Sequence, residues 1–321
     1  MAHAPAVVLA GIATAYAFAH RPAGAYAREP TRRLLVPLLF GIAVMVPPQP
    51  FLAQLPDPGH ESSYLGFLSG YFTDVTDLSG YDGGFTPAHL WFILYLLLFA
   101  LLTLPALVVI HRVALRREIG RPWMLVATPF VFLLAEALPA PEDVRSPFVT
   151  MAMFVAGFVL ASSKRLLALI RRRWEIVLLV AIVTMTCLYA IWITGADADW
   201  TDGTWQAVAF QLFESSNTWL WVLGLIGAAS AFLARSQTPL LRYANEAAYP
   251  WYVFHQTVIV VLAYGVVRWD APVGPKYLVL LVSSVAVTFA LYEVLVRRTD
   301  PTRFLFGLKP LRRAPRVDVA R

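Results

Sequence analysis

Ionisable side chains within apolar runs are the residues of this chain best suited to chemistry. A charged side chain at the centre of a spanning helix costs about 2.5–3.5 kcal/mol on insertion scales, so each one is a candidate site residue. His255 and Glu293 lie in the last two apolar runs. Counted from the basic end of each run at about 1.5 Å per residue, His255 lies about 9 Å deep and Glu293 about 6 Å deep. A histidine–carboxylate pair at one depth would fix the imidazole tautomer and stabilise its charged form.

A second group of polar residues lies at the opposite ends of such runs. His89 opens the stretch FTPAHLWFILYLLLF at residues 85–99. Its imidazole can face an aqueous vestibule while the Trp91 ring lies at the membrane interface. Glu136, near the end of another run, can line the same vestibule. We therefore expect an inner and an outer polar layer, joined by a polar tunnel.

Simpler interpretations of these residues stay open at this point. His255 could hydrogen-bond a neighbouring backbone group, and Glu293 could pair with the arginines that follow it. His89 could be a histidine at the level of the lipid headgroups, and Glu136 could be hydrated near the surface. The sequence does not decide between these interpretations and a functional site.

The composition indicates which elements must hold these residues. Of the 321 residues, 59% are hydrophobic and 14% are charged, whereas soluble domains carry about 45–50% and about 25%. Nine runs are long enough to cross a bilayer, at residues 4–20, 34–54, 89–110, 122–139, 147–163, 176–194, 216–234, 249–267 and 277–296. We predict an all-α polytopic helix bundle, with a membrane domain over residues 1–300 and a basic cytoplasmic tail over 301–321.

Basic residues predict the orientation of the bundle. If residues 21–33 are cytoplasmic and the runs alternate, 23 of the 26 Lys and Arg residues lie inside. This bias places the N-terminus outside and the C-terminus inside a cytoplasmic (inner) membrane. The net charge of +6 is then explained by the basic residues that orient the helices in the membrane. It favours anionic lipids as partners and argues against nucleic acid. The first run could also be a signal-peptide core, but the arginines that follow it oppose export and favour a spanning helix.

Three stretches carry a family resemblance. They are AREPTRRLLVPLLFGIAVMVPPQ (27–49), FTPAHLWFILYLLLF and NEAAYPWYVFHQTVIVVLAYGVV (245–267). In this order, on successive apolar runs, they resemble the acyltransferase type 3 family of integral membrane acyltransferases, most of all the branch that modifies glucans and other envelope polysaccharides. The resemblance implies transfer of an acyl group, commonly acetyl, from cytoplasmic acyl-CoA to a hydroxyl of an extracytoplasmic glycan. It implies no permanently bound cofactor.

The resemblance gives the candidate residues their roles. The catalytic candidates are His255, Glu293 and His89. The candidates for binding the coenzyme phosphates are Arg28, Arg32 and Arg33, whose guanidinium groups can bind them in bidentate fashion. The candidates for binding the sugar are Glu136 and Trp91. The three arginines also suit a purely topological role as membrane anchors.

The chain also departs from the family pattern. Members have about ten helices and a histidine on the first, whereas residue 1 here falls where the second would begin. We therefore expect that the first family helix is missing or comes from a partner subunit. This leaves open a non-catalytic, degenerate family member or a transporter, although no inverted repeat typical of transporters is seen. The lone Cys187 forms no metal-binding cluster with histidines.

Overall fold

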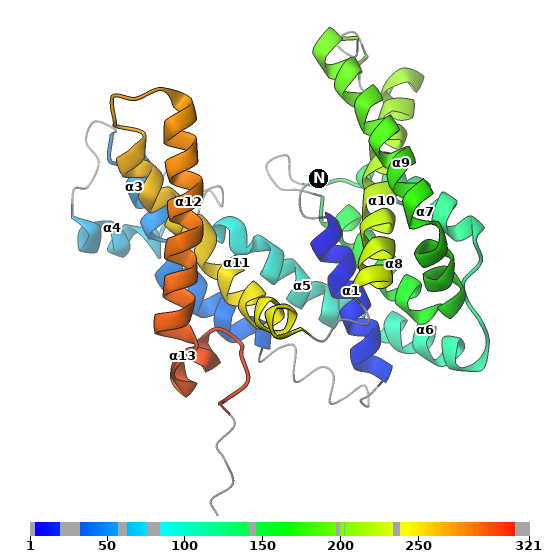
Figure 1. Ribbon diagram of the computed structural model, residues 1–321, viewed down its shortest axis with the longest axis horizontal. Helices are drawn as coiled ribbons and strands as arrows, with labels where there is room; N and C mark the ends of the chain where they lie inside the picture. The colour runs from blue at the N-terminus through cyan, green and yellow to red at the C-terminus, as the bar shows by residue number, and fades with distance from the viewer. Residues whose placement is uncertain are drawn as a thin grey trace, which may run out of the picture. The chain divides into compact units, whose positions relative to one another are not determined.

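The computed structural model describes residues 4–19, 33–56, 63–75, 84–140, 146–196, 200–201, 203–233 and 238–311. Every regular element in these ranges is helical (Figure 1), which confirms the all-α prediction. The chain divides into two compact units, whereas the sequence predicted one membrane domain. Unit 1 is Met1–Arg28 with Leu98–Ser236, and unit 2 is Glu29–Leu97 with Gln237–Arg321.

Unit 1 is a bundle of six helices in its described part. They are α1 (Ala4–Ala19), α6 (Leu104–Arg116), α7 (Trp123–Glu136), α8 (Pro147–Ser162), α9 (Lys164–Thr194) and α10 (Trp205–Phe232). α9 lies beside α10 and α1 lies beside α8 (Figure 1). A Cβ added to Gly157 would lie 2.2 Å from the carbonyl oxygen of Val8, and one added to Gly11 would lie 2.0 Å from that of Phe154. Reciprocal glycines thus let α1 and α8 approach backbone to backbone, as small residues do in membrane bundles.

The predicted span 89–110 is not one straight helix. It divides into α5 (Trp91–Leu102) and α6, with a bend of 63° between Ala88–Leu102 and Leu104–Arg116. Pro105 lies in the first turn of α6; it has no amide hydrogen to donate and its ring clashes with the carbonyl four residues earlier. At the bend, both the Thr103 hydroxyl and the Thr103 amide donate to the Phe99 carbonyl.

The basic stretch at residues 164–175 forms the first turns of α9. The Ser163 hydroxyl caps this helix by accepting from the Leu166 amide at 3.2 Å. α9 has 31 residues, about 46 Å at 1.5 Å per residue. It is therefore longer than a hydrocarbon core of about 30 Å.

Helix length and apolarity support a membrane protein. Within the described ranges, three helices could cross a bilayer, Arg33–Gln54, Lys164–Thr194 and Val273–Val296, or four if the bent pair counts as one span. Ala4–Phe18, Trp123–Glu136 and Pro147–Ser162 are apolar but shorter. The nine-span count and the orientation therefore stay predictions.

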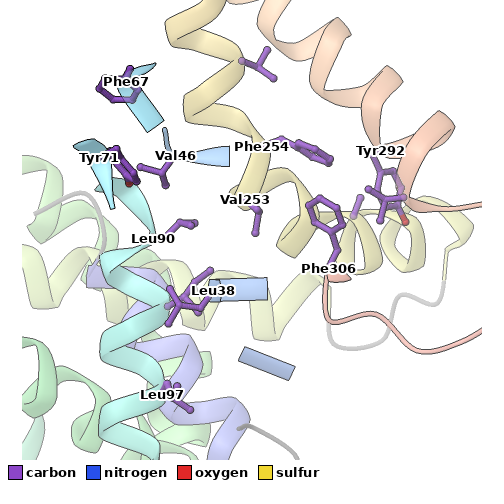
Figure 2. Packing of buried hydrophobic residues seen from close by; sticks show 14 residues of the cluster. Leu38, Val46, Phe67, Tyr71, Leu90, Leu97, Val253, Phe254, Tyr292 and Phe306 are labelled. Atoms are coloured by element: carbon purple, nitrogen blue, oxygen red, sulfur yellow. The ribbon is translucent and has the colours of Figure 1, made fainter. Parts of the chain in front are cut away.

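Unit 2 contains His89 and His255. Its elements are the helical segment 33–40, η1 (Gly41–Met45, a π-turn), α3 (Pro48–Gln54), α4 (Tyr64–Tyr71), η2 (Ala88–Leu90, a 3₁₀ turn), the start of α5, α11 (Pro239–Val266), α12 (Val273–Leu291), η3 (Tyr292–Val296, a π-turn) and α13 (Asp300–Leu305). Figure 2 shows its core, in which Leu90, Val253 and Phe254 lie among side chains from the other elements.

The packed part of unit 2 extends beyond residue 300, although the sequence predicted that a cytoplasmic tail begins at residue 301. Phe306 is buried, with ring centroids 4.7 Å from Phe254 and 5.3 Å from Phe40. Arg303 is also buried and donates to the Glu246 carboxylate at 2.7 Å. Residues 301–311 are thus a folded part of this unit, and residues 312–321 lie outside the described ranges.

Candidate functional site

His89 and His255 lie side by side in unit 2. Their ring centroids are 5.2 Å apart and their planes are nearly perpendicular, at 85°. The prediction of an inner layer with His255 and a separate outer layer with His89 is therefore wrong. It assumed that the helix begins at Tyr249, but α11 begins at Pro239. His255 is sixteen residues from that start, about 24 Å along the axis.

His89 is buried, with 6% of its surface exposed, and both its ring nitrogens are engaged. Nε2 lies 3.2 Å from the Val253 carbonyl oxygen, which can only accept, so Nε2 carries a hydrogen. Nδ1 then accepts a long hydrogen bond, 3.5 Å, from the Gln49 amide. With both nitrogens of His89 engaged by described residues, the geometry suits a positioning residue better than a base.

Gln49, in α3, belongs to a chain of hydrogen bonds that joins η1 and α3 to α11. Its amide also donates to the Thr257 hydroxyl at 2.8 Å. Thr257 in turn donates to the Met45 carbonyl at 2.6 Å. Buried polar networks that are fully satisfied make the local arrangement rigid. This network therefore fixes η1 and η2 against one face of α11.

The turn that presents His89 is strained. Ala88 has φ 42°, in the left-handed region that non-glycine residues avoid. The Thr86 hydroxyl accepts from the Ala88 amide at 3.0 Å, and the Tyr71 hydroxyl donates to the Thr86 carbonyl at 2.9 Å. Burial raises the pKa of Tyr71 to about 12, so this hydroxyl remains a donor. Strain of this kind clusters at functional sites.

His255 differs from its neighbour because one of its ring nitrogens has no partner in the described part of the chain. Its Nδ1 lies 2.7 Å from the Tyr252 carbonyl oxygen, so Nδ1 carries a hydrogen and the neutral ring has its lone pair on Nε2. The Tyr252 hydroxyl donates to the His89 carbonyl, which ties the two histidines together. His255 also lines a groove between α11 and α12 with a volume of about 330 Å³. Of the two imidazoles, only that of His255 can serve as a base.

Glu293 pairs with an arginine, the simpler of the two interpretations left open by the sequence. Both carboxylate oxygens lie 3.0 Å from an Arg297 guanidinium nitrogen. Among the described contacts no bond joins Glu293 to His255. Glu293 is twenty residues past the start of α12 whereas His255 is eleven before the end of α11. Glu293 and His255 are therefore about 14 Å apart along the common axis of the antiparallel helices α11 and α12.

The two candidates for sugar binding lie in different units. Trp91 is the first residue of α5, and its ring lies 5.3 Å from that of Tyr95. Glu136 is the last residue of α7 in unit 1 and is exposed. The role of Glu136 in sugar binding stays a prediction.

The arginines predicted to bind the coenzyme are only partly described. Arg28 and Arg32 lie outside the described residues. Arg33 is exposed, and its Nε lies 3.4 Å from the Gly307 carbonyl oxygen, next to α13. Their role toward phosphate stays a prediction.

Sequence reasoning missed Gln49, Thr257, Trp251 and Ser284. Gln49 carried a usable signal, because it is a polar side chain within the predicted span 34–54. Ser284 and Trp251 carried a weaker signal, since serine and tryptophan are ordinary residues of spanning helices. No group of three or more His, Cys, Asp or Glu residues that could hold a metal occurs in the described part of the chain.

Comparison with known proteins places this site in a family. The sequence model described as an acyltransferase domain, of the acyltransferase type 3 family, matches residues 7–293. The chain belongs to the acyltransferase type 3 family. The matched region includes His89, His255 and Glu293, so the histidine site lies within the acyltransferase domain. No curated protein and no solved structure matches the chain.

Proposed function

We propose that this acyltransferase moves an acyl group, with acetyl the first to test, from cytoplasmic acyl-CoA to a hydroxyl of an extracytoplasmic glycan. Family membership supports acyl transfer. The observation that supports the site is Nε2 of His255, the one nitrogen of the histidine pair with no partner among the described contacts. A general base of this kind is what a sugar hydroxyl needs before it can attack a thioester.

At His255, the proton of the acceptor hydroxyl would pass by way of Nε2 to the leaving sulfur. Nε2 takes the proton of the acceptor hydroxyl while the hydroxyl oxygen forms a bond to the thioester carbonyl carbon. The carbon–sulfur bond then breaks, and the coenzyme sulfur takes the proton from Nε2 and leaves as the thiol. The Tyr252 carbonyl holds the Nδ1 hydrogen throughout, so the ring keeps the tautomer that this exchange needs.

The distribution of charge supports the direction of transfer. The positive-inside bias of 23 of the 26 basic residues would place Arg28, Arg32 and Arg33 on the side of the coenzyme. Their guanidinium groups could bind its phosphates there, and anionic lipids would be their other partners. The glycan would then meet the site from the outer face of an inner membrane.

The assay uses the purified full chain in liposomes, with labelled acetyl-CoA and glucan oligosaccharides as acceptors. We expect label to accumulate on the oligosaccharide with time and to be released by mild alkali, as an O-ester is. A folded protein that transfers no acyl group to any oligosaccharide would contradict the proposal. It would instead favour a non-catalytic family member or a transporter, which liposome uptake of the same oligosaccharides would detect.

We expect His89→Ala to destabilise the protein. The change removes the imidazole partner of the Val253 carbonyl and of the Gln49 amide, which keeps its bond to Thr257, and each lost hydrogen bond costs about 0.5–1.5 kcal/mol. Thermal unfolding in detergent measures the loss. The control is His111→Ala on α6, where the described contact is a ring contact with Phe18 at 5.9 Å. Equal melting temperatures for the two variants would contradict the positioning role.

A further inference from the structure

The groove between α11 and α12 combines a polar part with an apolar part. Trp251, His255, Ser284 and Thr288 line one part, and Ile259, Tyr277, Leu280, Leu281 and Val285 line the other. The two helices are neighbours joined by a short connection (Figure 1), so they run antiparallel. His255 is eleven residues before the end of α11 and Ser284 eleven after the start of α12. The two side chains therefore lie at the same level.

Two buried polar atoms on this groove have no partner. The Ser284 hydroxyl and the Trp251 indole nitrogen are buried atoms of residues that line the groove, and neither makes a hydrogen bond in the described structure. Ser284 is a buried residue, with 8% of its surface exposed. A buried donor without an acceptor costs about 1–3 kcal/mol. Both groups can donate a hydrogen bond, so the missing partner is an acceptor such as a carbonyl oxygen.

The depth of Ser284 distinguishes a substrate from bulk lipid. Val273–Val296 is a 24-residue span with Ser284 near its middle, about 17 Å from either end. The hydrocarbon core is about 30 Å thick, with the polar groups of lipids at its edges. A phospholipid tail therefore offers no acceptor at this level. The thioester carbonyl of an acyl donor must come here if His255 is the base.

We propose that this groove binds the acyl group of the donor, with its carbonyl oxygen at Ser284 and Trp251 and its alkyl chain between α11 and α12. The proposal rests on the proposed acyl transfer and specifies the substrate class. The apolar part runs from Ser284 to Tyr277, seven residues along α12, or about 10 Å. This length suits a chain of medium length, so the groove accepts donors longer than acetyl.

The first experiment compares donors in the liposome assay, with acetyl-, octanoyl- and hexadecanoyl-CoA. We expect octanoyl transfer to be at least as fast as acetyl transfer. Leu280→Trp fills the apolar part and should lower the ratio of octanoyl to acetyl transfer about tenfold or more, as changes in apolar pockets do. Val282→Trp is the control, because Val282 is 59% exposed on the same helix and does not line the groove. Equal ratios in both variants would overturn the proposal.

The second experiment measures binding without turnover. An octanoyl thioester that carries a photoreactive group at the end of its chain should cross-link to α11 and α12 peptides. Ser284→Ala should lower this labelling severalfold. Ser283→Ala should not, because the Ser283 hydroxyl already donates to the Val279 carbonyl at 2.6 Å. Labelling elsewhere, or equal labelling by a photoreactive phospholipid that octanoyl-CoA does not displace, would contradict an acyl site.

The outcomes separate the two proposals. If the chain transfers acetyl but neither transfers octanoyl nor is labelled in the groove, acyl transfer stands and the groove proposal fails. If the groove is labelled and sensitive to Ser284→Ala but no acyl group is ever transferred, the proposed function fails.

Discussion

His255→Ala is expected to lower kcat for acyl transfer about a hundred- to ten-thousand-fold, the usual contribution of a positioned general base. The expectation rests on the hydrogen bond from Nδ1 to the Tyr252 carbonyl at 2.7 Å. That bond leaves Nε2 of His255 as the one acceptor nitrogen of the pair that has no partner among the described contacts, since both nitrogens of His89 are engaged. Loss of the imidazole removes the proton acceptor and leaves the acceptor hydroxyl a poor nucleophile.

Asparagine at this position separates catalysis from structure. In His255→Asn, the side-chain amide can still donate to the Tyr252 carbonyl, but no group replaces Nε2. We expect this variant to melt close to the wild-type temperature and to be as inactive as His255→Ala. Gln256→Ala, on the next residue of α11, is the control and should keep its activity. An active His255→Asn would show that His255 is not the base.

Gly157→Ala is expected to have the largest effect on stability. The added Cβ would lie 2.2 Å from the Val8 carbonyl oxygen and 3.1 Å from the Val8 Cα. Both atoms are backbone, so no side-chain rotation relieves the clash and α1 must move away from α8. Overpacking of this kind costs about 1–3 kcal/mol, occasionally more, and should lower the melting temperature and the yield of folded protein.

Gly265→Ala is the matched control for this glycine. Gly265 lies in α11 with no atom within 4 Å of an added Cβ, so alanine should be neutral or should stabilise by about 0.4–1 kcal/mol. Thermal unfolding of the two variants in one detergent gives the comparison. If Gly157→Ala melts with or above Gly265→Ala, the close contact between α1 and α8 is wrong.

The helices themselves were largely predictable from hydropathy. The apolar runs at 122–139, 147–163 and 277–296 correspond to α7, α8 and α12 with η3, within a few residues at each end. The beginning of α11 was not predictable in this way. Residues 239–248 carry Arg242, Asn245 and Glu246, so an apolar window excludes them although they are helical. This error in the start of α11 displaced His255 in the predicted site.

Contacts between residues close together in the sequence could be predicted from it, whereas contacts between distant residues could not. Glu293 and Arg297 are four residues apart on a helix, a spacing at which opposite charges pair. The contact of His89 with His255 joins residues 166 positions apart along the chain. It depends on how η2 packs against α11, which hydropathy does not encode. Gln49 has the same difficulty, since its partners His89 and Thr257 lie far along the chain.

The π-turn at Gly41–Met45 has a consequence for comparisons within the family. Its bond from the Val46 amide to the Gly41 carbonyl spans five residues, one more than an α-helical bond. Losing a single residue there would rotate the following part of the helix by about 100° while hydropathy stayed unchanged. Gln49 would then face away from His89. The direction in which Gln49 points from its helix thus depends on a single extra residue. An alignment gap at this position would mark a relative in which the histidine pair is held differently.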